Sequence, residues 1–314
     1  MSAPLQSLRV GVVGVGAMGR HHVRILSSLP GAELVGIHDP RIEAAEAVAA
    51  EHGARVFTSL DELAGGIDAA VLAAPTVTHA ETGCALLERG LHLLVEKPIA
   101  SSLAEADRLI AAADGEPGRR RVLAVGHVEF YNPAVQSLLG LGVPPRFVEI
   151  QRLGVFSPRS LDVDVVLDLM IHDLQILHGL DPSPVHEVRA TGIAVLSPRI
   201  DIANARVELA SGCVANLTAS RVSAERVRKL RAFLPSRYYS LDYQAQEIKG
   251  YRLEEGEGAR RIAPDDLPVE KGEPLRRELE AFVAACRGES APLVTGGAGR
   301  RALETALAVV EAIG

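Results

Sequence analysis

The sequence contains few cysteines and no long apolar run. Its three cysteines, Cys84, Cys213 and Cys286, lie far apart and in no metal-ligand spacing, so we expect reduced thiols and neither a disulfide nor a metal site. No apolar stretch approaches the ~18 residues that a membrane-spanning helix needs. The first residues also lack a basic segment followed by a signal-type apolar run. These absences predict a cytoplasmic protein with no membrane association.

An excess of positive charge is also missing. The chain has 33 Lys and Arg residues against 40 Asp and Glu residues, which gives a formal net charge of −7. A protein that binds nucleic acid must neutralise many phosphates, so we expect no nucleic-acid partner. With 314 residues, of which 47% are hydrophobic and 23% charged, the composition is typical of a globular protein with two domains.

Short apolar runs alternate with helical patterns over the first half of the chain. The expected strands are 8–13, 33–38, 69–74, 91–96 and 121–126, and their continuous apolar character favours parallel strands covered on both faces. A helix is expected over 102–114, where Ser102 and Glu105 have the spacing of a capping box. The pattern predicts an α/β domain over 1–125 with a Rossmann-type, doubly wound parallel sheet.

The pattern of expected helices and strands changes after residue 126. One helix is expected near 162–179, and alternating strands follow, two of them joined by a turn at Ser211–Gly212. Two helices close the chain, at about 274–287 and 299–312. We expect residues 126–314 to form an α+β domain for substrate binding and oligomerisation, with a largely antiparallel, open sheet. The pattern leaves open whether the C-terminal helices pack back on the first domain.

A glycine-rich loop follows the first expected strand. It reads Gly14-Val15-Gly16-Ala17-Met18-Gly19. Its glycines allow a tight turn, so that the backbone from Gly16 through Ala17 and Met18 can approach a pyrophosphate at the start of the next helix. We therefore expect a dinucleotide to bind here.

The residue that selects between the two nicotinamide dinucleotides comes at the end of the second strand. Asp39 stands 20 residues after Gly19, where a carboxylate can bind the adenosine ribose hydroxyls and would repel a 2′-phosphate. We expect NAD as the cofactor, and NADP is less favoured. The nearby Arg41 keeps NADP open as an alternative.

Three further motifs complete an ordered set. They are "AAPTVTHAE" (73–81), Glu96-Lys97-Pro98 and Asp168-x-x-x-His172. Together with the glycine loop and Asp39, they resemble the Gfo/Idh/MocA oxidoreductases, the relatives of glucose–fructose oxidoreductase and inositol dehydrogenase. The resemblance runs from residue 8 to the C-terminus. It implies hydride transfer between NAD and a secondary hydroxyl of a sugar or cyclitol, in a homodimer or homotetramer.

The resemblance also implies roles for single residues. Beyond the glycine loop and Asp39, the implied cofactor contacts are Pro75, Thr76, His79, Glu96 and Lys97. Asp168 and His172 match the helix of the second domain that faces the nicotinamide. Many relatives have a glycine-rich stretch before this Asp, whereas this chain reads "LDVDVVLD" (161–168), so the detailed shape of the sugar pocket is not implied.

The helical spacing suits proton transfer. At 100° per residue, Asp164, Asp168, His172 and Gln175 form one polar stripe, whereas Asp173 points away and is expected to be structural. Imidazole can remove the hydroxyl proton, so we expect His172 as the base and Asp168 as its orienting partner. The ammonium of Lys97 could stabilise the alkoxide or accept the proton itself, and which of the two is the base stays open. The alternative is that the stripe is an ordinary solvent-exposed face of the helix and that Glu96-Lys97-Pro98 is an ordinary turn.

A narrower likeness concerns the substrate. Residues 126–243 resemble members of the family associated with lipid A biosynthesis. These are taken to oxidise the 3-hydroxyl of UDP-N-acetylglucosamine for a partner sugar aminotransferase. Other substrates of the same chemistry are a free sugar, a cyclitol or another sugar nucleotide. An NAD-binding sensor with little turnover is the alternative from a different class.

The remaining candidates carry positive or titratable side chains. Arg228, Lys229 and Arg231 could bind the diphosphate of a nucleotide sugar, or could form a charged sheet edge or an oligomer contact. His127, at the end of a strand, is expected either to line the substrate cleft or to cap the strand. His21 and His22 follow the glycine loop, and proximity to the cofactor and surface exposure are equally compatible with the sequence.

Overall fold

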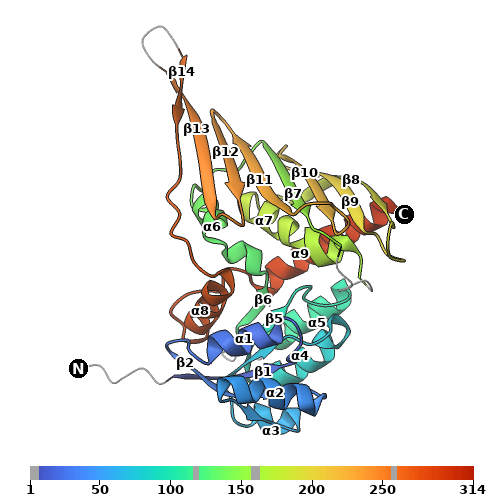
Figure 1. Cartoon of the computed structure of the whole chain (residues 1–314), viewed down its shortest axis with the longest axis vertical. Coiled ribbons are helices and arrows are strands. Elements are labelled where there is room, and N and C mark those ends of the chain that lie inside the picture. The colour runs from blue at the N-terminus through green and yellow to red at the C-terminus, as the bar shows by residue number, and fades with distance from the viewer. Residues whose placement is uncertain (1–6, 116–119, 157–162, 256–259) are drawn as a thin grey trace, which may run out of the picture. The chain divides into compact units, whose positions relative to one another are not determined.

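The computed structural model describes residues 7–115, 120–156, 163–255 and 260–314. They divide into two compact units (Figure 1). Unit 1 extends to Val128 and also contains Leu275–Arg300, and unit 2 contains Glu129–Pro274 and Arg301–Gly314. The first boundary thus lies at Val128, three residues beyond the expected end of the first domain at 125. Part of the C-terminal region belongs with unit 1.

Unit 1 contains a six-stranded sheet in the order β3-β2-β1-β4-β5-β6, with every neighbouring pair parallel. The strands are β1 Leu8–Val13, β2 Ala32–His38, β3 Arg55–Val56, β4 Ala69–Leu72, β5 His92–Glu96 and β6 Leu123–Gly126. The strand order reverses between β1 and β4, the position at which doubly wound sheets bind ligands. The predicted parallel sheet is confirmed. Of these strands, only β3 was not expected, because a strand of two residues is too short to show a hydrophobic pattern in the sequence.

The helices of unit 1 connect and cover these strands (Figure 1). They are α1 Gly19–Leu26, α2 Ile42–His52, α3 Leu60–Ala64, α4 His79–Glu88, α5 Leu103–Asp114 and α8 Pro274–Cys286, with a 3₁₀ turn at Thr76–Thr78. The predicted cap of α5 is present, since Ser102 Oγ accepts the Glu105 N–H at 3.3 Å. Glu105 Oε2 in turn accepts the N–H of Ser101 at 2.9 Å.

The hydrophobic core of unit 1 explains why α8 belongs to it. The apolar face of α8 contributes Leu275, Leu279, Phe282 and Val283 to the same buried cluster as the first strand and α1. Next to it, Val125 of β6 donates its N–H to the carbonyl oxygen of Val294 at 3.0 Å. Unit 1 is therefore completed by a segment that is far away in sequence.

Unit 2 contains an eight-stranded sheet in the order β14-β13-β12-β11-β7-β10-β9-β8. Of the strand pairs in the described part of unit 2, only β7 and β10 are parallel, so the predicted, largely antiparallel sheet is confirmed. The strands are β7 Phe147–Leu153, β8 Val185–Ile193, β9 Ile202–Leu209, β10 Val214–Ser220, β11 Val227–Leu234, β12 Arg237–Asp242, β13 Glu247–Glu255 and β14 Arg260–Pro264. The helices are α6 Pro133–Leu139, α7 Ile171–Leu180 and most of the longer α9 Gly296–Ile313, with a 3₁₀ turn at Val128–Tyr131. The residues of α9 up to Arg300 belong to unit 1.

One face of this sheet carries a row of aromatic side chains. Phe147, Phe233, Tyr238 and Tyr251 stand directly opposite one another on β7, β11, β12 and β13. The distances between successive ring centroids along the row are 5.5, 4.9 and 6.5 Å. Cross-strand neighbours share a face of the sheet, so these four residues form a continuous aromatic row.

The helix expected at 162–179 is shorter and begins differently. Residues 157–162 lie outside the described part of the chain. A π-helical turn spans Val166–Met170, and α7 follows it directly. A π turn is wider than an α turn, so the rotation of 100° per residue does not hold between Asp168 and His172. The regular stripe predicted from α-helical spacing is wrong in this respect.

Among the described residues, no helix is both long enough and apolar enough to cross a membrane.

Candidate active site

The glycine loop of unit 1 is shaped by close backbone contacts. Gly14 has φ of +87°, and a Cβ there would lie 2.7 Å from the carbonyl oxygen of Ala73. A Cβ on Gly19 would overlap the carbonyl oxygen of Gly14. A Cβ on Gly16 would have no described protein atom within 4 Å. Two glycines therefore close the turn, and the third leaves an open backbone surface.

This open surface lies at the N-terminus of α1. No side chain caps the helix, whose N-cap residue is the half-buried Met18, and Ala17 beside it is exposed. The free N–H groups and the dipole of a helix N-terminus attract phosphate. The loop could hold the pyrophosphate of a dinucleotide, and an added methyl group at Gly16 would project into the open space beside it.

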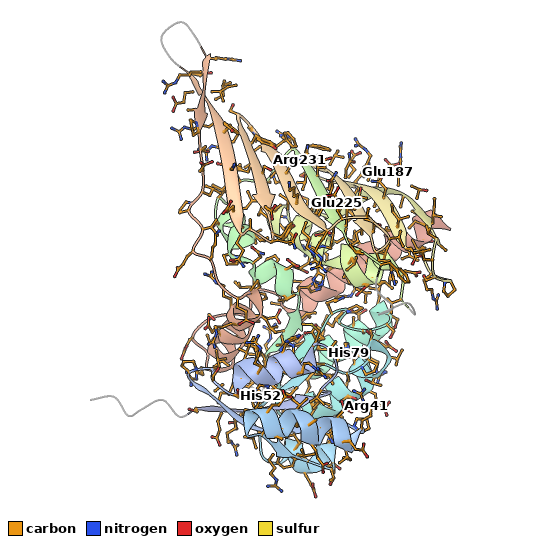
Figure 2. All side chains as sticks on the ribbon, in the orientation of Figure 1. Arg41, His52, His79, Glu187, Glu225 and Arg231 are labelled. Carbon is orange, nitrogen blue, oxygen red and sulfur yellow. The ribbon has the colours of Figure 1, made fainter. Side chains whose placement is uncertain are left out.

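Asp39 is held at the end of β2 by a ring of donors. Its Oδ2 accepts the N–H of Val15 at 2.8 Å, and its Oδ1 accepts the backbone N–H of Arg41 at 2.9 Å and Arg41 Nε at 3.1 Å. Burial acts to raise the pKa of Asp39, but the hydrogen bonds from Arg41 and Val15 outweigh it and lower that pKa. A charged carboxylate thus stands beside the glycine loop, and the exposed Arg41, which is labelled in Figure 2, is hydrogen bonded to it.

The loop after β4 carries three of the expected cofactor contacts. Pro75 is exposed, and Thr76 is half-buried at the start of the 3₁₀ turn. His79 is buried, with Nδ1 3.0 Å from the carbonyl oxygen of Pro98 and Nε2 2.9 Å from that of Ala74. Burial lowers the pKa of His79. His79 therefore ties the loop after β4 to the loop after β5 (Figure 2).

Lys97 and His127 lie near each other at the ends of β5 and β6. Lys97 is half-buried and precedes a cis peptide bond to Pro98. His127 is fully buried. Burial, and next the positive charge of Lys97, lower the pKa of His127 to about 3. A neutral imidazole and an ammonium thus stand together where open α/β sheets bind ligands.

Glu96 turns toward α1 within unit 1. Its Oε1 lies 2.6 Å from Nε2 of His22, and both residues are buried. His21, by contrast, is exposed. The two histidines that the sequence treats alike therefore have different surroundings. The buried position of His22 could not be predicted from the sequence, in which its place after the glycine loop was the one feature that drew attention to it.

In unit 2, the four residues of the expected stripe have separate surroundings. Asp168 lies in the π turn and is half-buried, while His172 and Gln175 are buried on α7. Asp164 Oδ1 accepts the N–H of Ile200 at 3.1 Å. Asp164 is thus engaged by the segment before β9.

Asp173 has the structural role that the sequence predicts. It is buried on α7 and accepts hydrogen bonds from Arg152, at 3.0 Å from Nε and 2.6 Å from Nη2. Arg152 Nη1 also donates to Glu129 Oε1 at 3.0 Å. Burial acts to lower the pKa of Arg152, but the carboxylates of Asp173 and Glu129 outweigh it and raise that pKa.

The expected phosphate cluster of Arg228, Lys229 and Arg231 does not converge. Arg228 stands opposite Arg152 on β7 and donates to Glu129 at 2.7 Å. Lys229 and Arg231 lie on the other face of the sheet, where Arg231 pairs with Glu149 at 3.2 Å (Figure 2). Successive residues of a strand point to opposite faces. The three side chains therefore do not all lie on one face of the sheet, and their part in substrate binding stays a prediction.

Comparisons with known proteins extend over nearly the whole chain. Residues 8–127 match the oxidoreductase family with an NAD-binding Rossmann fold that is called Gfo/Idh/MocA. The UDP-N-acetylglucosamine 3-dehydrogenase of Acidithiobacillus ferrooxidans is 38% identical over 309 residues, or 98% of this chain and 97% of that protein. Inositol 2-dehydrogenase 1 of Saccharopolyspora erythraea is 29% identical over 310 residues, or 90% of this chain and 88% of that protein.

Solved structures agree with these relatives. A structure of the A. ferrooxidans dehydrogenase has a TM-score of 0.91 at 38% identity, covering 98% of each chain. A putative myo-inositol dehydrogenase from Sinorhizobium meliloti has a TM-score of 0.82 at 23% identity, over 98% of this chain and 97% of that one, and so shares its fold. The glycine loop, the parallel sheet and the full-length likeness lead to one conclusion: this chain belongs to the Gfo/Idh/MocA family of NAD-binding oxidoreductases.

Proposed function

We propose that the protein oxidises the 3-hydroxyl group of UDP-N-acetylglucosamine to a 3-keto sugar, with NAD as the hydride acceptor. The observation that carries this proposal is the likeness to a UDP-N-acetylglucosamine 3-dehydrogenase along the full length of both chains. Because the likeness includes unit 2 as well as the dinucleotide-binding unit, it bears on the substrate and not only on the cofactor. A sugar aminotransferase is the expected consumer of the keto product.

The choice of NAD over NADP rests on Asp39. Its lowered pKa keeps the carboxylate charged, and a 2′-phosphate beside it would be repelled. Arg41 is already hydrogen bonded to this carboxylate, which reduces its capacity to bind a phosphate. We expect at least tenfold tighter binding of NAD than of NADP, measured by fluorescence titration. Equal affinities would contradict this assignment.

Three side chains are assigned to the chemistry. When bound, NAD accepts the hydride. We assign His172 and Lys97 to the hydroxyl proton, one as its acceptor and the other as a donor that stabilises the alkoxide. Asp168 is assigned to orienting the base. The neutral state of His127 leaves the ammonium of Lys97 as the positive charge of this pair.

The activity is tested with purified protein, NAD and UDP-N-acetylglucosamine, by the absorbance of NADH at 340 nm. Because the equilibrium of alcohol oxidation can favour the alcohol, a sugar aminotransferase with glutamate is added to trap the ketone. We expect NADH and an aminated sugar nucleotide. Turnover only with another sugar from a panel would replace the substrate, and NAD binding without any turnover would indicate a sensor.

Single substitutions test the assigned roles. Lys97→Met and His172→Asn should each lower kcat by about 10²- to 10⁴-fold, the usual contribution of a proton-transfer group. His172→Asn should leave the affinity for NAD unchanged. Lys271→Met and His186→Asn change exposed residues and serve as matched controls. Full kcat in either active-site variant would reject its role.

We also propose that the protein forms homodimers or homotetramers through the face of the unit 2 sheet that carries the aromatic row. Tyr251 is 47% exposed in the chain by itself, and the other three aromatic side chains of the row are half-buried. Aromatic side chains that stay partly exposed side by side are typical of protein interfaces. Replacing Tyr238 and Tyr251 by glutamate should convert the oligomer to a monomer in size-exclusion chromatography with light scattering. An unchanged mass would place the interface elsewhere.

A further inference from the structure

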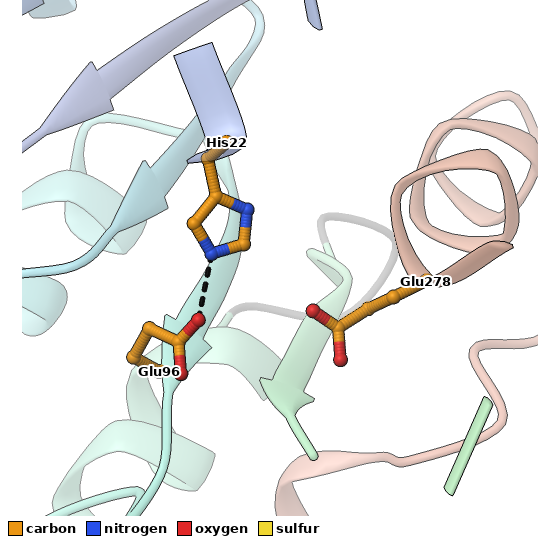
Figure 3. Close-up of side chains that lie close together, drawn as sticks. All are labelled: His22, Glu96 and Glu278. Atoms are coloured by element: carbon orange, nitrogen blue, oxygen red, sulfur yellow. Dashed lines mark hydrogen bonds and ion pairs between the residues drawn. The ribbon is translucent and has the colours of Figure 1, made fainter. Parts of the chain in front are cut away.

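Three ionisable side chains from distant parts of the sequence meet inside unit 1. His22 comes from α1, Glu96 from the end of β5 and Glu278 from α8 (Figure 3). Their exposed fractions are 0%, 7% and 0%. Two carboxyl groups and one imidazole are thus enclosed together. Nothing in the hydride transfer proposed above uses Glu278.

The arrangement of their donor atoms is compact. His22 Nε2 lies 2.6 Å from Glu96 Oε1. One possible ligand atom of each of the three residues lies within 4.8 Å of the other two. Figure 3 shows the Glu278 carboxyl group pointing from α8 toward the pair formed by His22 and Glu96. Gly126 faces Glu96, and a Cβ on that glycine would lie 3.1 Å from Glu96 Oε2, so the glycine leaves room for the carboxyl group.

Within the part of the chain that the structure describes, Glu278 has no partner that explains its burial. Neither of its carboxyl oxygens has a hydrogen-bond partner among the described residues. Burial raises the pKa of Glu278, and the charge of Glu96 raises it further. A proton would remove the charge of Glu278, but the new O–H group would still lack an acceptor in the described protein. Burying an unpaired polar group is costly, so a bound group between these side chains would stabilise the cluster.

We propose that His22, Glu96 and Glu278 bind one divalent transition-metal ion, with Zn²⁺ as the best match. Imidazole and carboxylate are both good ligands for Zn²⁺, and three protein ligands with one water molecule form a common zinc site. Ligand distances of about 2.0–2.2 Å place neighbouring ligands roughly 3–3.6 Å apart. To bind an ion, His22 Nε2 and Glu96 Oε1 would separate from 2.6 Å to this spacing, and the carboxyl group of Glu278 would approach them from within 4.8 Å.

Such an ion would meet both requirements of the cluster. It supplies the positive charge that two buried carboxylates need, and it gives Glu278 a partner. Because the ligands must be deprotonated, its binding releases protons. The ion would also join the helix after the glycine loop, the strand that ends at Glu96 and the late helix α8. This role goes beyond hydride transfer, since it does not depend on the substrate.

Metal binding is tested on the full-length, tag-free protein after removal of metals with a chelator. Zn²⁺ is titrated in competition with a chromogenic chelator, and bound metal is measured by mass spectrometry after gel filtration. We expect about one Zn²⁺ per chain and a higher Tm with Zn²⁺. Glu278→Gln should weaken binding at least 100-fold and abolish the rise in Tm. Glu280→Gln, on the exposed side of the same helix, should bind as the wild type does.

The opposite results are equally defined. Less than about 0.1 Zn²⁺ or Mn²⁺ per wild-type chain would overturn the proposal and leave a proton to neutralise the cluster. Equal binding by wild type and Glu278→Gln would also overturn it, because the ion would then occupy surface groups. Mn²⁺ binding that depends on Glu278 would support the site. If Glu278→Gln does not fold, His22→Gln is measured in the same way.

Discussion

The buried charges of unit 2 are paired through short hydrogen bonds. Arg152 is 1% exposed and contacts two carboxylates, those of Asp173 and Glu129. An arginine fits a carboxylate with two parallel hydrogen bonds, and this geometry allows a full charge to be buried. Removing one partner of such a pair leaves an uncompensated charge in the interior.

We expect Asp173→Asn to lower the free energy of unfolding by about 3–5 kcal/mol, the usual effect of breaking a buried ion pair. The substitution keeps the volume of the side chain, so the loss reflects charge. Urea denaturation provides the measurement. Glu187→Gln removes the exposed partner of Arg189 and should change the stability by less than about 1 kcal/mol. Equal effects of the two substitutions would refute the argument.

Asp201 is a second buried carboxylate that is satisfied by the backbone. Its Oδ2 accepts the N–H groups of Val195, Leu196 and Ser197 at 2.8, 2.6 and 2.9 Å. Burial acts to raise the pKa of Asp201, but the bonds from the Ser197 side chain and the three N–H groups outweigh it. They lower that pKa to about 2.

A lowered pKa in the folded state makes the contribution of Asp201 depend on pH. The contribution is complete above the pKa of unfolded Asp, about 3.9, and is lost as the pH falls through about 2. The difference in Tm between wild type and Asp201→Asn should therefore be largest near pH 6 and shrink as the pH falls from 4 to 2.5. Thermal melts by circular dichroism test this. The exposed Asp61→Asn is the control, and a constant Tm difference would contradict the expectation.

At the scale of elements, the glycines between β1 and α1 have two different roles. Gly14 and Gly19 are required by the backbone itself, whereas Gly16 faces open space. The same residue type thus serves the fold at two positions and the ligand at one.

Gly16→Ala should fold with an unchanged Tm and bind NAD at least tenfold more weakly, because its methyl group would meet the pyrophosphate. Gly65→Ala is a suitable control, since Gly65 ends α3 with φ of −67° and its Cβ would lie 3.5 Å from the nearest atom. Isothermal titration with NAD gives the affinities. Unchanged affinity in Gly16→Ala would move the phosphate site away from this loop.

Regular elements could be predicted from the sequence because each has a period or a cap. The parallel strands of unit 1, the cap at Ser102 and the hairpin at Gly212 are of this kind. The π turn at Val166–Met170 has no such signal, since its apolar residues also suit an ordinary α-helix. The buried position of Glu278 could not be predicted from the sequence either. Its neighbours in space, His22 and Glu96, are distant in sequence, and only tertiary packing brings them together.

The candidate site was predictable to a similar extent. The glycine loop and Asp39 could be located because one strand and one turn define their geometry. The pairing of Arg228 with Glu129 could not be foreseen, because it depends on which face of β11 is covered. A cluster of like charges in the sequence does not predict whether the side chains meet at one site, because this depends on the register of the strand.

At the scale of the whole molecule, the chain passes between the two units three times. It does so at Val128–Glu129, Pro274–Leu275 and Arg300–Arg301. The N-terminal segment therefore does not contain all of unit 1. The buried cluster of that unit includes Leu275, Leu279, Phe282 and Val283 of α8.

We expect a fragment of residues 1–128 to be incompletely folded, with a broad thermal transition and strong binding of a hydrophobic dye. Joining residues 275–300 to it through a flexible linker should restore a cooperative transition, because α8 then covers the apolar surface. Calorimetry and dye fluorescence compare the two. A cooperative transition in the short fragment would show that α8 is dispensable.

The late position of α8 also affects how the protein is made. Synthesis proceeds from the N-terminus, so the strands of unit 1 leave the ribosome long before the helix that completes their core. During most of translation, the nascent chain exposes the apolar surface that α8 later covers. Final folding of the dinucleotide-binding unit is therefore expected to wait until α8, near the end of the chain, has emerged from the ribosome.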